Sequence, residues 1–219
     1  MSRLAGPGTA IAMALVVIGL AVAVLLTPLY THAALANAES AASLGVSPQQ
    51  AEALSDQTIG EMVFGPARFA FPMVDGGARF YDDAEASHLR DARAVLYGLA
   101  LAVLVGLVIL AAGYVRRRRD PAFWRSVARG AGVLAAAAVI VGAIFLVAFE
   151  AAFTLFHEIF FPGGNWSFDP ATERLVQLYP TQFWESTSTV LGAILIVVGA
   201  VVWSLARRHA AALAVAGSR

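Results

Sequence analysis

The sequence contains no cysteine. This absence excludes a disulfide, a thiol nucleophile, a cysteine-based metal site and lipidation of the chain on a cysteine of its own. The sequence also lacks lysine, so arginine carries all of its fixed positive charge. Charged residues make up only 14% of the 219 residues, and the formal net charge is +0. The net charge gives no sign of nucleic-acid binding, and the segments at about 29–94 and 154–187 contain no basic patch, so no nucleic-acid partner is predicted.

Two common catalytic motifs are missing as well. No G-x-S-x-G pattern marks a nucleophile elbow. The segment HEIFF begins at His157, but Phe161 stands where the second histidine of H-E-x-x-H would be, which disfavours a zinc protease. Ser87 and Ser167 lie near the histidines without any sign of activation. Two histidines with carboxylates leave a metal site open, although the spacing is unspecific.

What the chain does contain is hydrophobic sequence, at 59% of all residues. Four apolar runs, at about 9–28, 95–115, 131–153 and 188–206, approach the roughly 20 residues that a helix needs to cross a bilayer. None of them contains Lys, Arg or Asp, and Glu150 is the only acidic residue in any of them. A chain this short cannot bury four such helices in a soluble core. The sequence therefore predicts an all-α membrane protein, a four-transmembrane-helix bundle forming a single membrane domain over residues 1–219.

The arginines predict the topology. Ten of them flank one side of the predicted spans and five lie on the other. Because positive residues favour the cytoplasmic side, both termini are predicted to be cytoplasmic, with outer loops at about 29–94 and 154–187. The ten are Arg3, Arg207, Arg208, Arg219 and the six between Arg116 and Arg129. An alternative remains for the first run, because Ala36-Asn37-Ala38 resembles a signal-peptide cleavage site.

The long outer loop carries signals of local structure. Ser47 as N-cap, with Pro48 at the first helical position, predicts a short helix to about Ile59. Residues 68–81 alternate apolar and polar around Asp-Gly-Gly, which predicts a small β-hairpin. These segments would form an extracytoplasmic cap of short helices with a hairpin.

A further helix is predicted to begin outside the membrane and to continue into the second span. Asp82 or Asp83 would cap it, with Glu85 in its first turn. His88 lies seven residues before Val95, which is about 10 Å at roughly 1.5 Å per residue. Asp91 shares the face of His88, and Arg90 and Arg93 lie nearby; an ordinary solvated helix turn is the alternative interpretation.

The end of the third span carries a second polar face. Glu150, Thr154, His157 and Glu158 stand at i, i+4, i+7 and i+8, which places them on one side of one helix. A carboxylate at the depth of Glu150 is expensive unless it faces the bundle interior and finds a partner. We therefore expect Glu150 inside the bundle, supporting His157. The alternative is an interfacial face without chemistry.

Spans joined by a short loop are usually antiparallel neighbours, so the two histidines should come to the same depth. His88 and His157 would then converge with Asp91, Glu150 and Glu158 at the outer membrane surface. Such a group suits general acid–base catalysis on a substrate at the lipid headgroup level.

The second outer loop is aromatic and resembles a membrane-facing lid. Aromatic rings with polar edges favour the membrane interface. The sequence Pro-Gly-Gly at 162–164 breaks the preceding helix, and Asp169 is a plausible cap for a helix through Leu178. The predicted lipid-facing or substrate-facing residues of this loop are Phe161, Trp166, Asp169, Tyr179, Phe183 and Trp184.

Two segments together resemble a known family. LFHEIFFPGGNWSFDPATERLVQLYPTQFW, with EASHLRDARAV upstream, is similar to the integral membrane family that includes the lipoprotein intramolecular transacylases. The resemblance implies action on diacylglyceryl-modified bacterial lipoproteins in the cytoplasmic membrane, without a cofactor. It implies transfer of the sn-2 acyl chain to the amino group of the N-terminal cysteine, giving the lyso form. His88 and His157 match the motif histidines, and Asp91 would assist them.

Two other classes stay open from the residues themselves. One is a non-catalytic membrane scaffold whose outer cap binds a partner protein. The other is a metal-dependent membrane hydrolase.

Overall fold

The computed structural model describes residues 5–217, so Arg3 and Arg219 of the charge argument lie outside the described residues. Within this range the chain is helical and forms no strand. Four helices are long and apolar enough to cross a membrane, which confirms the predicted four-span plan. The helices are α1 (Ala5–Leu25), α2 (Pro28–Asn37), α3 (Ser40–Leu44), α4 (Pro48–Val63), α5 (Asp83–Arg117), α6 (Pro121–Val147), α7 (Phe149–Phe160), α8 (Arg174–Leu178) and α9 (Thr181–Ala216).

The chain folds into two compact units. The first contains most of α1, residues 98–143 of α5 and α6, and α9 from residue 190. The second contains residues 24–97 and 144–189, and therefore holds α2, α3, α4, α7 and α8 with the N-terminal parts of α5 and α9. All of the predicted site residues belong to the second unit.

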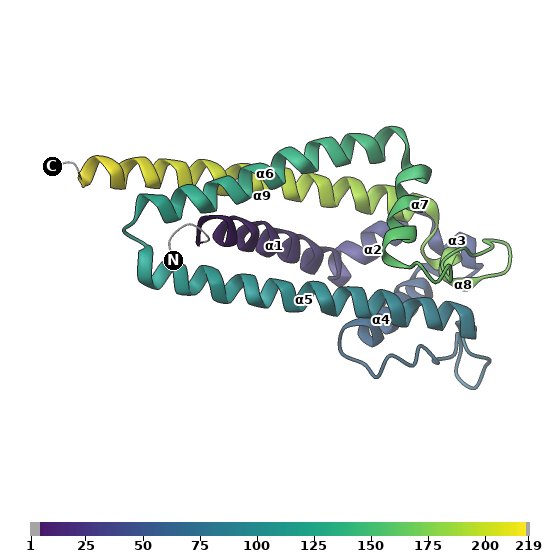
Figure 1. Cartoon of the computed structure of the whole chain (residues 1–219). Helices are drawn as coiled ribbons and strands as arrows, with labels where there is room; N and C mark the ends of the chain where they lie inside the picture. Colours follow the sequence, from purple (N-terminus) through teal and green to yellow (C-terminus); the bar gives the residue numbers. More distant parts are fainter. Residues whose placement is uncertain (1–4, 218–219) are drawn as a thin grey trace. The chain divides into compact units, whose positions relative to one another are not determined.

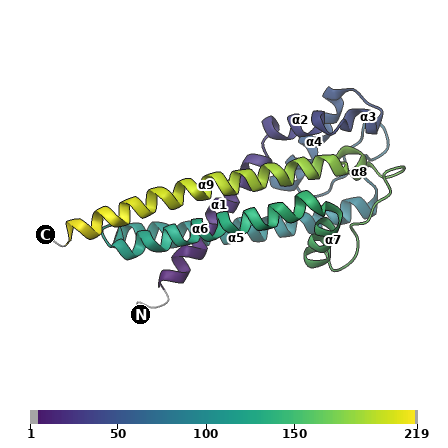
Figure 2. The same ribbon diagram turned by 90° about the horizontal axis from the view of Figure 1, so that it is seen from above.

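Small residues let the helices of the first unit approach closely. A Cβ atom at Gly130 of α6 would lie 2.1 Å from the carbonyl oxygen of Ala10 in α1. A Cβ atom at Gly199 of α9 would lie 2.9 Å from the carbonyl oxygen of Ala131 in α6. Glycine at such crossings is typical of membrane helices, where packing replaces the hydrophobic effect as the force of association. Figure 1 shows these parts of α5, α6 and α9 extended in one direction, and Figure 2 shows α1 crossing them obliquely.

The outward faces of these helices expose large apolar side chains. A soluble surface rarely carries so many together, whereas a lipid-facing one requires them. Examples from α5, α6 and α9 are Leu101, Leu104, Val108, Ile140 and Val201, each more than half exposed in the protein alone.

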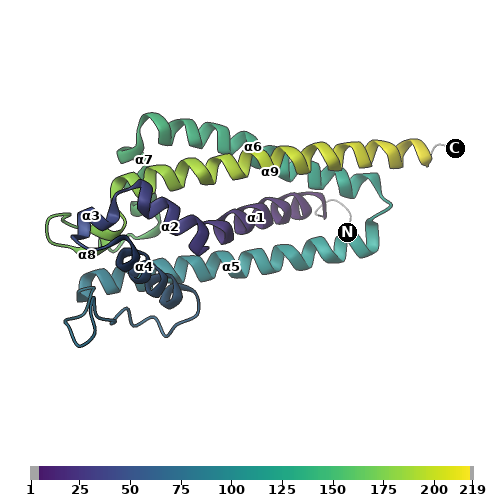
Figure 3. The same ribbon diagram turned by 180° about the vertical axis from the view of Figure 1, so that it is seen from behind.

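The second unit has a core of its own. Helices α2, α3, α4 and α8 pack on one another there, as Figure 3 shows. Two buried hydroxyl pairs tie this core together: Thr58 with Tyr81 at 2.9 Å, and Ser55 with Tyr179 at 3.0 Å. Both phenols are satisfied by partners on α4, which meets the requirement that a buried polar group be hydrogen-bonded.

The predicted helix after Ser47 and the predicted hairpin at 68–81 both lie in the second unit. Ser47 does cap α4, accepting a hydrogen bond from the Gln50 backbone at 3.2 Å, but α4 extends to Val63 instead of Ile59. The hairpin is reduced to one antiparallel bridge between Pro72 and Arg79. Proline has no N–H group to continue a ladder, which accounts for so short a pairing.

The third predicted span is not one continuous helix. Helix α6 ends at Val147, and Ala148 leaves the helical conformation at φ −144° and ψ 49° before α7 begins. The break interrupts few hydrogen bonds, because Ala148 N still donates to Ile144 O and Ala152 N to Ala148 O. Neither proline nor glycine occurs at this point. The run from 131 to 153 was therefore wrongly predicted as a single helix.

Candidate active site

His88 lies in the N-terminal part of α5, seven residues before the predicted apolar run. Its side chain is buried, with 8% exposed, and its Nδ1 atom has no hydrogen-bond partner. The ring packs against Phe161 at 4.7 Å and Phe168 at 5.6 Å between centroids. The alternative of an ordinary solvated helix turn is therefore wrong for this residue.

His157 lies in the last turn of α7 and is equally buried. Its Nδ1 atom lies 2.8 Å from the carbonyl oxygen of Phe153. Because a carbonyl oxygen only accepts, Nδ1 must carry the proton, and Nε2 of the neutral ring keeps its lone pair. The rings of Phe153 and Trp166 lie 4.1 Å and 5.1 Å from the His157 ring.

The two histidines face one another, as the sequence predicted. Their ring centroids are 5.9 Å apart and the ring planes differ by 27°. Phe161 contacts both, at 4.7 Å from His88 and 5.5 Å from His157. The pair thus lies in an aromatic enclosure that belongs entirely to the second unit.

Both imidazoles are held in the neutral form. Burial, and after it the neighbouring His157, lowers the pKa of His88 to about 4, while Asp91 and Asn165 oppose the shift. Burial also lowers the pKa of His157, against the hydrogen bond to Phe153. At neutral pH the site therefore offers two uncharged rings, each with one proton and one lone pair.

Asp91 is linked to the loop that follows α7. The Asn165 side chain donates a hydrogen bond of 2.6 Å from Nδ2 to Oδ2 of Asp91. Gly164 precedes Asn165 with φ 75°, a left-handed conformation that favours glycine and turns the loop toward α5. Sequence reasoning missed Asn165. The available signal was an amide between the Pro-Gly-Gly break and Trp166, within a stretch otherwise apolar.

Arg90 and Arg93 do not support the histidines. Arg93 instead binds the end of α4, where its Nη1 atom donates to the carbonyl oxygens of Glu61 at 2.7 Å and Gly65 at 2.6 Å. Its Nη2 atom donates to the Tyr97 hydroxyl at 2.9 Å. Carbonyl groups at a helix end lack helical partners, so this cation satisfies them. Arg90 is exposed and forms no ion pair within the described part of the chain.

The carboxylates of α7 also lie elsewhere than predicted. Glu150 and Glu158 share one side of α7 with His157, yet both are exposed and neither has a hydrogen bond or ion pair among residues 5–217. The expectation that Glu150 faces the bundle interior is wrong. Its position in the first turn of α7 is favourable for another reason, because a negative charge there complements the helix dipole.

The aromatic loop divides into walls of the site and core residues. Phe161 and Trp166 line the histidines, whereas Tyr179 and Phe183 are buried in the core of the second unit and are not lipid-facing. Trp184 is 39% exposed and packs against Phe183 at 5.3 Å. Of the predicted lipid-facing rings, Trp184 alone has the exposure that this role requires.

Asp169 does not cap a helix. Helix α8 begins only at Arg174, with Glu173 at its N-cap position. The Asp169 carboxylate instead accepts a hydrogen bond of 2.9 Å from the backbone of Ala171, which closes a local turn.

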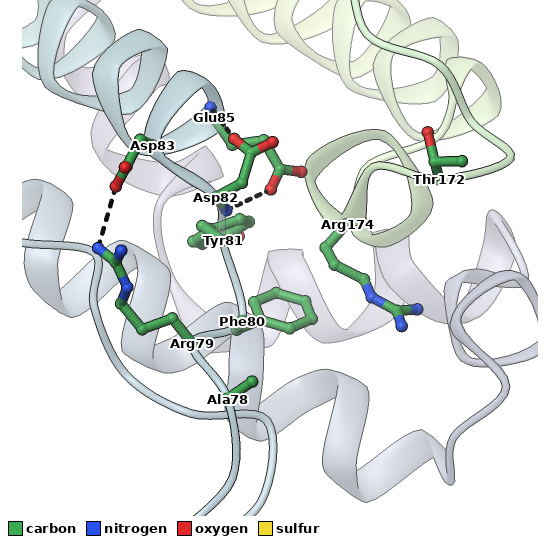
Figure 4. A pocket seen from close by; sticks show the side chains of 9 residues that line it. All are labelled: Ala78, Arg79, Phe80, Tyr81, Asp82, Asp83, Glu85, Thr172 and Arg174. Carbon is green, nitrogen blue, oxygen red and sulfur yellow. Dashed lines mark hydrogen bonds and ion pairs between the residues drawn. The ribbon is translucent and has the colours of Figure 1, made fainter.

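Glu85 joins the start of α5 to α8. Asp82 caps α5, as predicted, and forms a capping box with Glu85: Asp82 Oδ1 accepts from the Glu85 backbone, and Glu85 Oε2 accepts from the Asp82 backbone, both at 2.8 Å. Its other oxygen accepts from the backbone N–H of Leu175 at 2.6 Å. Figure 4 shows this carboxylate against Asp82, in a cavity of about 440 Å³ that Arg79 and Arg174 also line. Burial raises the pKa of Glu85.

Among the residues that the structure describes, no three His, Asp or Glu side chains lie close enough together to bind a metal ion.

Known proteins resemble this chain in both sequence and fold. An "uncharacterized protein" of Aquifex aeolicus (strain VF5) is 27% identical over 121 residues, so the chain spans about half (53%) of that relative's length and 55% of its own. The structure of the membrane integral lipoprotein intramolecular transacylase Lit from Bacillus cereus is similar with a TM-score of 0.77, at 18% identity and 94% coverage of each chain. A variant of that protein with a histidine replaced by arginine gives a TM-score of 0.71 at 16% identity, over 94% of this chain and 91% of the other.

The family model for lipoprotein intramolecular transacylase Lit matches residues 8–184, which include both histidines, Asp91 and Asn165. This chain belongs to the lipoprotein intramolecular transacylase family.

Proposed function

We propose that this protein transfers the sn-2 acyl chain of a diacylglyceryl lipoprotein to the α-amino group of the same lipoprotein's N-terminal cysteine. The observation that carries the proposal is the facing pair of buried histidines, with rings 5.9 Å apart in an aromatic enclosure. Uncharged imidazoles of this kind suit proton transfer at neutral pH. Family membership supplies the class of substrate.

The reaction needs one proton acceptor and one proton donor. The neutral amine attacks the sn-2 ester carbonyl, so that a C–N bond forms and the C–O bond to glycerol breaks. The amine loses a proton, and the departing glycerol oxygen gains one, leaving an amide and a free sn-2 hydroxyl. Since the amine and the ester belong to one molecule, binding supplies proximity, and no acyl-enzyme is required.

The hydrogen bonds suggest how the roles divide. His157 donates from Nδ1 to Phe153, which leaves Nε2 as the base for the attacking amine. His88, also neutral, donates a hydrogen bond from its ring N–H to the oxyanion. The imidazolium of His157 then returns the proton to the departing glycerol oxygen, which leaves both rings neutral again. The aromatic enclosure excludes water that would otherwise divert the ester to hydrolysis.

We further infer that the site faces the outer leaflet, with both termini in the cytoplasm. The arginine distribution supports this orientation, and the outer headgroup level is where an S-diacylglyceryl substrate would lie. Single cysteines introduced at Ala53 and Ser126 should label from opposite sides of the membrane. Labelling of both from the outside would overturn the orientation.

The test of the function is mass spectrometry of lipoprotein N-termini from bacteria that express the protein. Wild-type protein should convert the diacylglyceryl form to the N-acyl lyso form. His88→Ala and His157→Ala should each lower conversion about 10²–10⁴-fold, the usual contribution of a general acid or base. His32→Ala is the matched control, because His32 pairs with Asp56 at 3.0 Å, away from the pair. Equal conversion by all three variants would refute the proposal.

A further inference from the structure

A cavity of about 340 Å³ adjoins the histidine pair in the second unit. Val95, Phe160 and Phe161 provide apolar walls, and Asp91 and Asn165 provide the polar groups. Phe161 is shared with the active site, because its ring also contacts both histidines. A group bound in this cavity would therefore lie beside the proposed catalytic residues.

Asp91 is the only charged residue that lines this cavity. Asn165 holds one carboxylate oxygen, Oδ2, at 2.6 Å. No hydrogen bond or ion pair from the described residues occupies the other oxygen, and no arginine pairs with this carboxylate there. Asp91 thus has a fixed orientation and retains an acceptor.

The chemistry of this arrangement selects a cation that donates hydrogen bonds. A carboxylate binds an ammonium group through short, charge-assisted hydrogen bonds, which are about twice as strong as neutral ones. Asp91 is exposed, so water screens part of this attraction, and the apolar walls contribute by contacting the carbon atoms next to the ammonium group. A ligand whose only charge is negative would be repelled by Asp91. An apolar ligand would form no hydrogen bond with the free oxygen of Asp91.

We propose that this cavity binds a primary ammonium group on Asp91, with Asn165 as the residue that positions the carboxylate. Two sources carry that group. One is the N-terminal α-ammonium of a lipoprotein substrate, and this assignment rests on the proposed function. The other is the headgroup of phosphatidylethanolamine. An α-amine with a pKa of about 8 is mostly charged at neutral pH, so a substrate arrives as the cation. Binding on Asp91 would then place its nitrogen beside the histidines before it loses the proton.

The test measures equilibrium binding, so that it is independent of turnover. The ligands are two S-dialkylglyceryl lipopeptides whose ether-linked chains cannot be transferred: one with a free N-terminus and one acetylated there. Thermophoresis gives the Kd of each for the purified full-length protein in nanodiscs of phosphatidylglycerol. We expect the free amine to bind wild-type protein about tenfold more tightly than the acetylated ligand, a ratio equal to about 1.4 kcal/mol.

The variants separate the subsite from the function. Asp91→Asn keeps the shape and removes the charge, and should abolish the preference for the free amine; Asn165→Ala should reduce it. Asp83→Asn is the matched control, because Asp83 is an exposed aspartate of the same helix that pairs with Arg79 at 3.1 Å. If both ligands bind wild-type protein equally, the ammonium site is refuted while lipopeptide binding stands. If neither binds, the proposed function itself is contradicted.

The lipid source has its own arm. Both ligands are measured again in nanodiscs that contain phosphatidylethanolamine. Loss of the amine preference in wild-type protein, by competition from the headgroup, would assign the site to the lipid as well as to the substrate. An unchanged preference assigns it to the lipoprotein alone. A preference of equal size in Asp91→Asn, in either membrane, would refute the proposal.

Discussion

Removal of the Glu85 carboxylate should destabilise the second unit, and the hydrogen bonds of Glu85 allow the change in the free energy of unfolding to be estimated. Glu85 is 2% exposed and accepts hydrogen bonds from two backbone N–H groups, those of Asp82 and Leu175. Glu85→Ala leaves the buried Leu175 N–H without a partner, which costs about 1–3 kcal/mol. It also removes the capping box, at about 1 kcal/mol. The sum is about 2–4 kcal/mol.

Glu85→Gln should cost less than Glu85→Ala. The single amide oxygen of glutamine can replace only one of the two Glu85 oxygens, so either the Asp82 N–H or the Leu175 N–H loses its hydrogen bond. Burial raises the pKa of Glu85, so the folded protein becomes less stable as the pH rises through that pKa and the carboxyl group ionises. Glutamine cannot ionise, so Glu85→Gln avoids this loss of stability. We expect about 1–2 kcal/mol for glutamine, on the scale of a lost hydrogen bond.

The assay is thermal unfolding of the purified protein in detergent at pH 7. At about 2–4 °C per kcal/mol, Glu85→Ala should lower the midpoint by about 5–15 °C, and Glu85→Gln by about half of that. Glu158→Ala is the control, since Glu158 is exposed and has no partner among the described residues. A midpoint for Glu85→Ala equal to that of the control would refute the reasoning.

Three further predictions follow from other contacts. The pKa of His88 is about 4 in the folded protein and 6.5 in a free side chain, so between these pH values the unfolded chain binds a proton that the folded chain does not. The free energy of unfolding should therefore decrease as the pH falls from 6.5 to about 4. His88→Ala should make this decrease smaller in acid-denaturation curves. Gly130→Leu should reduce the yield of folded protein in membranes, because a Cβ atom would lie 2.1 Å from a carbonyl oxygen of α1, whereas Gly142→Leu, with open space around it, should not. Glu150→Leu should convert lipoproteins at nearly the wild-type level, while the lost interaction with the helix dipole destabilises α7 by about 0.3–1 kcal/mol. A large decrease in conversion would show that Glu150 has a partner after all.

Much of the fold could be predicted because it depends on local signals. Long apolar runs give the four spans, and Asp82 with Glu85 gives the start of α5. The break at Ala148 could not be predicted, because alanine is a good helix former and nothing in the sequence near it favours a break. Apolar periodicity likewise cannot tell a lipid-facing ring from one buried in a cap, which is why Tyr179 was misplaced.

The site was predictable only where helix geometry determined it. The rings of His88 and His157 do lie 5.9 Å apart, although His157 belongs to α7, beyond the break at Ala148. The positions of Arg93 and Asn165 depend on which loop folds over which helix, and that is a tertiary contact without a local signal. Glu150 was misplaced because a charge in an apolar run was assumed to need a protein partner, whereas the helix break leaves it exposed.

The central claim is that one molecule of lipoprotein both gives and receives the acyl chain. A crossover experiment with purified protein tests it directly. Two diacylglyceryl lipopeptides of different peptide mass are mixed, one of them carrying a ¹³C-labelled sn-2 chain. Mass spectrometry should show N-acyl lyso products only in the parental pairings, and none with His157→Ala. Labelled chains on the unlabelled peptide, or free fatty acid in place of amide, would contradict the claim.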